Sequence, residues 1–304
     1  MKTPWWFLHK TPLAFLLLPG SWIYYLVGRC VYLFRKIGVY KSRRPIICVG
    51  NILAGGVGKT PIVRQIAGFF DAPVVMRGYK KSVKTGNVGD EAVMLARDGL
   101  QVHVGDRKSN IMLLDKQSDI NTPIVMDDGF QNPKIKKTVS ILVFDQSLGY
   151  GNGFLIPAGP MREPKSAIRR ADAIIVIRSA RPKKHFVLPT DIPVFYATNK
   201  TVSPYGARDK LFAFAGIGYP KKFFAALPNI VGKKSFADHY QYTDEDLKKL
   251  MDMARKKRAK LITTEKDWVR LPDALRDEIK YAKLETIIDD NFWQWLGDKI
   301  KWQH

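Results

Sequence analysis

The sequence predicts an α/β fold with a mainly parallel sheet, and two patterns lead to this prediction. Short apolar segments recur as continuous runs, which is typical of strands that are covered on both faces. Stretches with helical periodicity separate most of these runs, and such alternation implies the crossover connections of parallel strands. A length of 304 residues with 46% hydrophobic residues is enough for one large domain or two modest ones.

The predicted elements follow one another from residue 45 to residue 300. The expected strands are Pro45–Val49, Pro73–Met76, Val102–Val104, Pro123–Met126, Ile141–Phe144, Ala173–Ile177, Val194–Ala197, Leu211–Ala215 and Leu261–Thr263. The expected helices are Thr60–Phe70, Glu91–Arg97, Asn110–Lys116, Thr243–Arg258 and the amphipathic Asp290–Ile300. A polar stretch that contains Pro and Gly, Asn199–Asp209, indicates a boundary between a larger domain at residues 41–200 and a smaller α/β domain at residues 201–304.

The net charge of +22 favours anionic partners, because such a field attracts nucleic acid, an acidic membrane or a phosphorylated substrate. The distribution of charge is uneven, since no acidic residue precedes Asp71 while eight lysines and arginines precede Pro45. The two cysteines, Cys30 and Cys48, exclude a disulfide scaffold and form no metal-binding spacing. These cysteines fit a reducing compartment.

The first 40 residues are expected to form a membrane-associated helical segment. Leu13–Phe34 is almost wholly apolar, but Pro19 and Arg29 interrupt it, which disfavours a transmembrane span. Tryptophan and tyrosine side chains with flanking basic residues suit helices that lie in the interface of an anionic membrane. Two alternatives remain, a helical hairpin buried against the domain and a true span.

The segment PIICVGNILAGGVGKT predicts a phosphate-binding loop between a strand and a helix. Glycines allow backbone N–H groups to surround phosphate oxygens, and the helix dipole favours the negative charge. Lys59 is expected to reach the β- and γ-phosphates of ATP, and Thr60 to ligate Mg²⁺. Leu53 stands where the strict motif has glycine. The fold is therefore expected to be of the P-loop NTPase type, with nucleotide contacts from Gly55, Gly56, Val57, Gly58, Lys59, Thr60 and Pro61.

A second feature that indicates nucleotide binding is a pair of adjacent acidic residues. Asp127 and Asp128 directly follow the expected strand Pro123–Met126, where P-loop enzymes place the carboxylate that holds Mg²⁺. Two adjacent carboxylates would repel each other without a cation. Both are candidate metal ligands together with Thr60, although an aspartate in an ordinary turn or helix cap is the alternative. Glu91 could also support the metal, or could simply be a charge at a helix start.

Several further motifs resemble one enzyme family in its own order along the chain. They are GNILAGGVGKTP, Arg77–Tyr79 (RGY), Gly89–Glu91 (GDE), Asp127–Gln131 (DDGFQ), Leu155–Pro164 (LIPAGPMREP), Phe236–Tyr240 (FADHY) and Thr263–Asp267 (TTEKD). Together with the apolar N-terminus, they are similar to tetraacyldisaccharide 4′-kinase, the lipid A kinase of Gram-negative inner membranes. The chain departs from the usual family pattern at Asn132 and Tyr240, where members often have histidine.

The resemblance implies transfer of phosphate from ATP to the 4′-hydroxyl of an acylated glucosamine disaccharide 1-phosphate. It implies a protein held peripherally or monotopically on the cytoplasmic face of the inner membrane, and a catalytic pair of Asp90 as base and His239 as its tuning partner. A sugar hydroxyl is a poor nucleophile, so a base at this point is chemically reasonable. Without the resemblance, Asp90 could equally be a charge at a helix start and His239 an ordinary histidine.

Four other polar residues are candidates for contacts with phosphate or substrate. Arg162 lies in a loop whose conformation Pro and Gly residues fix, and an arginine held in this way could stabilise negative charge on a phosphate. The alternative is that Arg162 only forms an ion pair with Glu163. Arg77 and Arg107 are candidate phosphate contacts, and Gln131 could contact substrate or brace the Asp127 turn. No chemical role is assigned to Thr264–Asp267.

Two rival functions remain open. The chain could be a soluble P-loop NTPase or small-molecule kinase whose N-terminal apolar residues are core, or a nucleotide-dependent nucleic-acid-binding module. The aromatic and basic recognition signatures of nucleic-acid binders are absent from the sequence, so nucleic acid is not expected as a partner.

Overall fold

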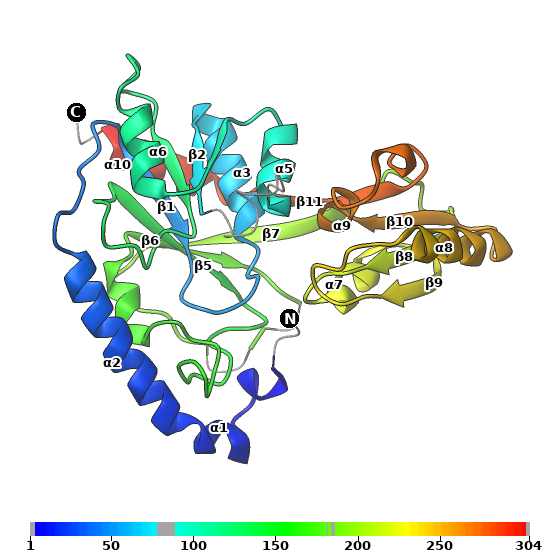
Figure 1. Cartoon of the computed structure of the whole chain (residues 1–304), viewed down its shortest axis with the longest axis horizontal. Helices are drawn as coiled ribbons and strands as arrows, with labels where there is room; N and C mark the ends of the chain where they lie inside the picture. Colours follow the sequence, from blue (N-terminus) through cyan, green and yellow to red (C-terminus); the bar gives the residue numbers. More distant parts are fainter. Residues whose placement is uncertain (1–3, 78–88, 181, 184–185, 302–304) are drawn as a thin grey trace. The chain divides into compact units, whose positions relative to one another are not determined.

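The computed structural model describes residues 4–77, 89–180, 182–183 and 186–301 (Figure 1). Within these residues the chain divides into two compact units. The large unit holds residues 4–198 and 286–301, and the small unit holds Asn199–Glu285. The chain passes between them within two long strands, β7 (Val194–Val202) and β11 (Lys280–Ile288). Residues 286–301 thus belong with the large unit, whereas the sequence analysis assigned them to the smaller domain.

The large unit is built on strands in the order β3-β2-β4-β1-β5-β6-β7, and the recorded pairs of neighbours are parallel. Every residue of β1, β2, β4 and β6 is buried, which explains their unbroken apolar sequences. The mainly parallel α/β sheet is therefore confirmed. The strands of this unit besides β7 are β1 (Ile46–Gly50), β2 (Val74–Met76), β3 (Val102–Val104), β4 (Ile124–Asp127), β5 (Val139–Asp145) and β6 (Ala173–Ile177).

The helices of the large unit use their apolar stripes to cover this sheet. In α3 (Lys59–Phe70), Ile62, Val63 and Ile66 are fully buried at helical spacing. Figure 1 shows α3 grouped with α5 (Asp90–Arg97) and α6 (Arg107–Leu114). The last helix, α10 (Asp290–Lys301), buries Phe292, Leu296 and Ile300 in the same core. This burial is the physical reason why the chain returns to the large unit.

The small unit has a four-stranded order, β11-β10-β8-β9, in which the recorded pairs are parallel. Its other strands are β8 (Leu211–Ala215), β9 (Ile230–Ser235) and β10 (Lys260–Thr264). Its helices are α7 (Pro220–Ala226), α8 (Asp244–Lys256), α9 (Glu265–Trp268) and the 3₁₀ turn η3 (Asp273–Leu275). A capping box formed by Thr243 and Asp246 starts α8.

The N-terminal segment forms η1 (Trp5–Phe7), α1 (Pro12–Leu16) and α2 (Leu18–Arg35), and a further 3₁₀ helix, η2 (Lys165–Arg170), follows the Arg162 loop. Pro19 lies in the first turn of α2, where its missing N–H costs no hydrogen bond, so the helix continues through it. Ser21 is the buried residue of α2. The described part of the chain contains no helix whose length and apolar character would suffice to cross a membrane.

Candidate active site

The phosphate-binding loop lies between β1 and α3, as the sequence predicts. Gly55 and Gly58 have φ of +108° and +82°, in the left-handed region where glycine is unstrained. Leu53, at the position where the strict motif has glycine, is buried and pairs with Met161 in an isolated bridge. Val57 is also buried, while Gly55 and Gly56 are exposed. The apolar residues thus hold the loop in place and leave its glycine backbone accessible to a ligand.

Lys59 occupies the first turn of α3 and faces two oxygen acceptors. Its Nζ donates to Asn51 Oδ1 at 3.2 Å and lies 3.1 Å from Asp128 Oδ1. The Lys59 side chain is only 13% exposed, so the surrounding groups hold the ammonium in one place. A phosphate at the N-terminus of α3 would offer this ammonium further charged acceptors.

Asp127 is the last residue of β4, the strand that pairs directly with β1. Val49 stands opposite Asp127 in the register, which brings the carboxylate to the end of β1 where the phosphate-binding loop begins. Asp127 is 4% exposed, and its buried Oδ1 has no hydrogen-bond partner among the residues that the structure describes. Burial, opposed by the charge of Lys59 and reinforced by that of Glu91, raises the pKa of Asp127 to about 7.

Asp128 faces the cationic side chains of Lys59 and Arg162. It adopts a left-handed conformation with φ of +49°, and both its carboxylate oxygens accept from Nη1 of Arg162, at 3.2 and 3.0 Å. Although burial alone would raise the pKa of Asp128, the charges of Lys59 and Arg162 lower it below its ordinary value. The repulsion expected between Asp127 and Asp128 is therefore relieved by these cations, and metal binding by Asp128 stays a prediction.

Arg162 is held beside the phosphate-binding loop by backbone hydrogen bonds. Its N–H donates to Ile52 O at 2.7 Å, and Ala54 N–H donates to Pro160 O at 2.6 Å. The expected alternative, a pair between Arg162 and Glu163, does not form, because Glu163 instead accepts from Arg170 at 2.7 and 2.6 Å. Arg162 and Lys59 thus place two positive charges beside the Asp128 carboxylate, next to the phosphate-binding loop.

Two of the proposed substrate contacts have structural partners. Arg107 donates Nη2 to the backbone oxygens of Asp127 and Asp128, at 2.7 and 3.0 Å, and so braces the turn after β4. Gln131 Nε2 donates to Asn51 O at 2.8 Å and to Glu163 Oε2 at 3.1 Å. Both side chains thus hold the loops of the site together, in keeping with the bracing alternative given for Gln131. A contact of Arg107 with phosphate, or of Gln131 with substrate, stays a prediction.

Arg77 and the Asp90–Glu91 pair lie on either side of a segment outside the described residues. Arg77 directly follows β2 and is exposed. The pKa of Arg107 is lowered, mainly by burial and to a smaller extent by the positive charge of Arg77. Gly78 and Tyr79 of the RGY motif are outside the described residues. Asp90 and Glu91 form the first turn of α5, where the helix dipole stabilises acidic side chains. The negative charge of Glu91 contributes to the raised pKa of Asp127, so the two carboxylates act on each other electrostatically.

A divalent cation fits the residues around Asp127. A buried carboxylate oxygen without a partner is costly, and a cation would supply the missing interaction. No cluster of three or more His, Cys, Asp or Glu side chains suited to a metal occurs among the residues placed by the structure. Mg²⁺ does not require one, because it is commonly bound by one or two carboxylates together with phosphates and waters. Asp127 and Thr60 would hold it, with Glu91 close by.

His239 belongs to the small unit, whereas Asp90 belongs to the large unit. His239 has φ of +58° and a 59% exposed side chain, and its Nδ1 lies 3.2 Å from Nη2 of Arg270. The pairing of Asp90 with His239 stays a prediction.

Sequence reasoning missed two polar residues that hold the site together. Asn51, the first residue after β1, is fully buried and accepts from Lys59, while Glu163 joins Gln131 to Arg170. A polar side chain directly after an apolar strand was a usable signal for Asn51. For Glu163 the only signal was its proximity to Arg162.

The loop glycines, the enclosed Lys59 and the buried carboxylate at the end of the adjacent strand define a P-loop nucleotide-binding protein. The family model described as tetraacyldisaccharide-1-P 4′-kinase matches residues 13–301. The chain belongs to this family.

Individual relatives agree with this assignment over almost the whole chain. The tetraacyldisaccharide 4′-kinase of Phenylobacterium zucineum is 36% identical over 321 residues, which cover 95% of this chain and 96% of that protein. The enzyme of the same name from Rickettsia bellii is 35% identical over 291 residues, with 86% and 87% covered. The crystal structure of LpxK from Aquifex aeolicus in complex with ATP has a TM-score of 0.75 and 26% identity, covering 95% of this chain and 98% of that one.

Proposed function

We propose that this chain transfers the γ-phosphate of ATP to the 4′-hydroxyl of a tetraacylated glucosamine disaccharide 1-phosphate at a membrane surface. The family named after this reaction and the ATP complex of the Aquifex aeolicus relative support the proposal. The observation that carries it is the convergence of Lys59 and Arg162 on Asp128 beside the glycine loop. Phosphoryl transfer depends mainly on positioning and on stabilising charge, and these residues provide both.

Each residue has a distinct task in this proposal. Lys59 and the loop amides bind the phosphates, with Lys59 exchanging Asp128 for a phosphate oxygen. Arg162 stabilises negative charge on the transferred group. Asp90 accepts the proton of the sugar hydroxyl, and His239 assists it. Mg²⁺, held by Asp127 and Thr60, would neutralise charge on the β- and γ-phosphates when bound.

The proposed membrane contact is the outer face of α1 and α2. Ser21 Oγ donates to Leu155 O at 2.8 Å and Tyr24 OH donates to Arg162 O at 3.2 Å, so α2 lies against the loop that carries Arg162. The side of α2 away from this loop presents large apolar residues to solvent, and basic residues occur in and after the helix. The exposed apolar residues of α1, α2 and the following turn include Phe15, Leu16, Trp22, Ile23, Leu26, Val27, Val31, Leu33, Phe34 and Ile37.

An apolar and basic surface of this kind suits an anionic membrane interface. A buried helical hairpin, the first alternative, does not fit a helix in which Ser21 is the buried residue. We therefore propose that the protein is peripheral or monotopic on the cytoplasmic face of the inner membrane of a Gram-negative bacterium. There it would meet a substrate whose acyl chains lie in the bilayer.

The proposed reaction is tested by ATP consumption with and without the acylated disaccharide 1-phosphate in mixed micelles. We expect consumption that depends on both the lipid and Mg²⁺, and its loss in Lys59→Ala, which removes the phosphate contact. Lys222→Ala, in the small unit, is the matched control and should retain activity. Consumption of ATP at the same rate without the lipid would favour the rival soluble NTPase.

The nucleic-acid alternative is separated by a filter-binding assay. A nucleic-acid-binding module would retain DNA or RNA with strong salt dependence, because binding releases counterions. We expect no salt-sensitive retention that depends on ATP.

A further inference from the structure

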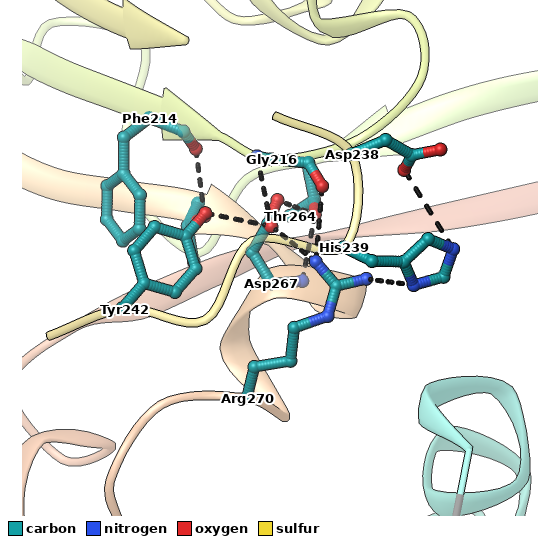
Figure 2. Close-up of polar contacts among 9 residues, drawn as sticks. Phe214, Gly216, Asp238, His239, Tyr242, Thr264, Asp267 and Arg270 are labelled. Atoms are coloured by element: carbon teal, nitrogen blue, oxygen red, sulfur yellow. Dashed lines mark hydrogen bonds and ion pairs between the residues drawn. The ribbon is translucent and has the colours of Figure 1, made fainter. Parts of the chain in front are cut away.

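The TTEKD motif, to which the sequence analysis assigned no role, places a buried carboxylate at the centre of a hydrogen-bond network in the small unit (Figure 2). Asp267 is fully buried, and its Oδ1 accepts from Gly216 N at 3.0 Å, Tyr242 OH at 2.8 Å and Arg270 Nη1 at 3.1 Å. Its Oδ2 accepts from Thr264 Oγ1 at 2.6 Å. These neighbours satisfy the carboxylate and fix its position, which a buried charge requires.

Arg270 carries this network to His239. The Arg270 side chain is 2% exposed, and its Nη1 is shared between Asp267 Oδ1 and Gly216 O, each at 3.1 Å. Its other terminal nitrogen, Nη2, lies 3.2 Å from His239 Nδ1 (Figure 2). The backbone N–H of His239 donates to the same Gly216 O at 3.0 Å. The backbone oxygen of Gly216 thus holds both the Arg270 guanidinium and the backbone N–H of His239, whose conformation is left-handed.

We infer that Arg270 is a positioning residue that holds His239 as the neutral tautomer with its proton on Nε2. A guanidinium has only donors, so the ring nitrogen that it contacts must accept with a lone pair. The proton of the neutral ring is then on Nε2, at the edge of the ring away from Arg270. Asp238 Oδ1 lies 4.0 Å from Nε2, beyond hydrogen-bond distance, but its negative charge favours an N–H at that edge.

This tautomer determines what His239 can do in the reaction, a consequence that rests on the proposed function. With Nδ1 occupied by Arg270 and Nε2 already protonated, the neutral ring has no lone pair left to accept a proton. The ring can donate a hydrogen bond from Nε2 to a carboxylate or to the acceptor oxygen. In the proposed reaction the general base is therefore a carboxylate, and His239 acts as a hydrogen-bond donor.

The tautomer is measured by ¹⁵N NMR of the full-length protein labelled on histidine, at about pH 8, above the ordinary histidine pKa of about 6.5. The His239 signals are assigned by their loss in His239→Gln. We expect coupling of Nε2 to its proton and an unprotonated Nδ1 in the wild-type protein. A proton on Nδ1 would overturn the inference. This measurement requires neither ATP nor lipid, so it is independent of the proposed function.

The positioning role is tested with Arg270→Lys, which keeps the positive charge opposite Asp267 but loses the planar fork. We expect a mixture of His239 tautomers and a fall in kcat of about tenfold, with the KM for ATP changed less than about twofold. Arg276→Lys is the matched control, since Arg276 donates to Val269 O in the same unit and does not contact His239.

The two variants should have similar Tm values. An Arg270→Lys protein with unchanged tautomer and unchanged kcat would overturn the positioning role. A wild-type protein with the expected tautomer but no lipid phosphorylation would support the tautomer assignment and contradict only the proposed function.

Discussion

At the scale of single residues, the charged side chains of the site neutralise one another unevenly. Asp128 lies between Lys59 and Arg162, while Asp127 is buried and has one carboxylate oxygen without a hydrogen-bond partner in the described part of the chain. The two adjacent aspartates therefore have different environments and different pKa shifts, raised for Asp127 and lowered for Asp128. The different environments show that Asp128 is neutralised by two cationic side chains, while Asp127 is held in a setting that penalises its charge.

The raised pKa of Asp127 predicts how pH changes the stability of the metal-free protein. The pKa of about 7 in the folded protein lies above the ordinary aspartate value of about 3.9. Between about pH 4 and pH 7 the folded state therefore binds more protons than the unfolded state, and the contribution of Asp127 to stability falls as the pH rises. Asp127→Asn removes this cost.

We expect Asp127→Asn to be more stable than the wild type at about pH 8 in EDTA, by on the order of 2 kcal/mol. The difference should vanish near pH 4. Thermal unfolding of both proteins at the two pH values measures it, and Asp191→Asn, at an exposed position of the large unit, is the control. An Asp127→Asn protein that is less stable than wild type at pH 8 without metal would show that the carboxylate is not costly in the fold.

Asp90→Asn tests the assignment of the base. We expect kcat to fall by roughly 10²–10⁴-fold while the Kd for ATP changes little, because the lost interaction belongs to proton transfer. Steady-state kinetics and nucleotide titration separate the two quantities. Asp98→Asn, at the other end of α5 where Asp98 pairs with Arg64, should leave kcat near the wild-type value. A near wild-type rate in Asp90→Asn would make the base assignment wrong.

At the scale of elements, helix α2 has an exposed apolar face on one side and contacts the candidate active site on the other. One side is attached to the Arg162 loop through Tyr24 and Ser21, and the opposite side exposes Trp22 and Leu26, at 67% and 59%. If that face enters a membrane, replacing these two side chains with serine removes apolar area that the bilayer would bury, worth roughly 1.5–3 kcal/mol for each large side chain.

We expect Trp22→Ser with Leu26→Ser to weaken binding to anionic vesicles by at least about tenfold. The affinity for ATP should stay unchanged. Ile287→Ser, which removes an equally exposed apolar side chain from β11, is the matched control. Vesicle sedimentation measures the binding, and equal binding of all three proteins would exclude α2 as the membrane contact.

The C-terminal helix α10 is a structural part of the large unit. Phe292 is fully buried and packs edge-on against Phe195 of β7, with ring centroids 5.3 Å apart. Phe292→Ala should cost about 3–5 kcal/mol of unfolding free energy, because it leaves a cavity in a packed core. Denaturant unfolding measures this cost, with the partly exposed Trp293→Ala expected to cost less. A loss below about 1 kcal/mol would contradict the packing of α10 in this core.

Much of the fold could be predicted from the sequence, because buried parallel strands have continuous apolar sequences. The strands that were missed, β9 and β11, lack this pattern. β9 contains Gly232 and two lysines, and β11 alternates between buried and exposed positions. The apolar stripe of α10 predicted a helix but could not indicate which sheet it covers. Helix periodicity specifies a buried face, not the partner of that face.

In the candidate site, the sequence predicted the residues near the phosphate-binding loop better than their contacts. The strand-loop-helix order located Lys59, and the end of the neighbouring strand located Asp127. The sequence could not show that Arg107 bonds to backbone oxygens, or that Arg162 compensates Asp128. Both contacts join segments far apart in the chain, and they depend on tertiary positions that no local pattern determines.

At the scale of the whole molecule, the proposed function combines three properties of the chain. In this proposal a P-loop sheet binds the nucleotide, the basic and apolar N-terminal face would meet the bilayer, and a second unit carries His239 on an ordered hydrogen-bond network. The net charge of +22 favours an acceptor and a surface that are both anionic. A lipid that already bears a phosphate satisfies these requirements together.

The most direct test is to identify the product formed from ATP, Mg²⁺ and the tetraacylated disaccharide 1-phosphate by the purified wild-type protein. We expect mass spectrometry and ³¹P NMR to show one added phosphate, on the 4′-oxygen, and no product from an otherwise identical 4′-deoxy lipid. An unchanged lipid, or a phosphate that appears on the 4′-deoxy analogue, would contradict the proposed reaction.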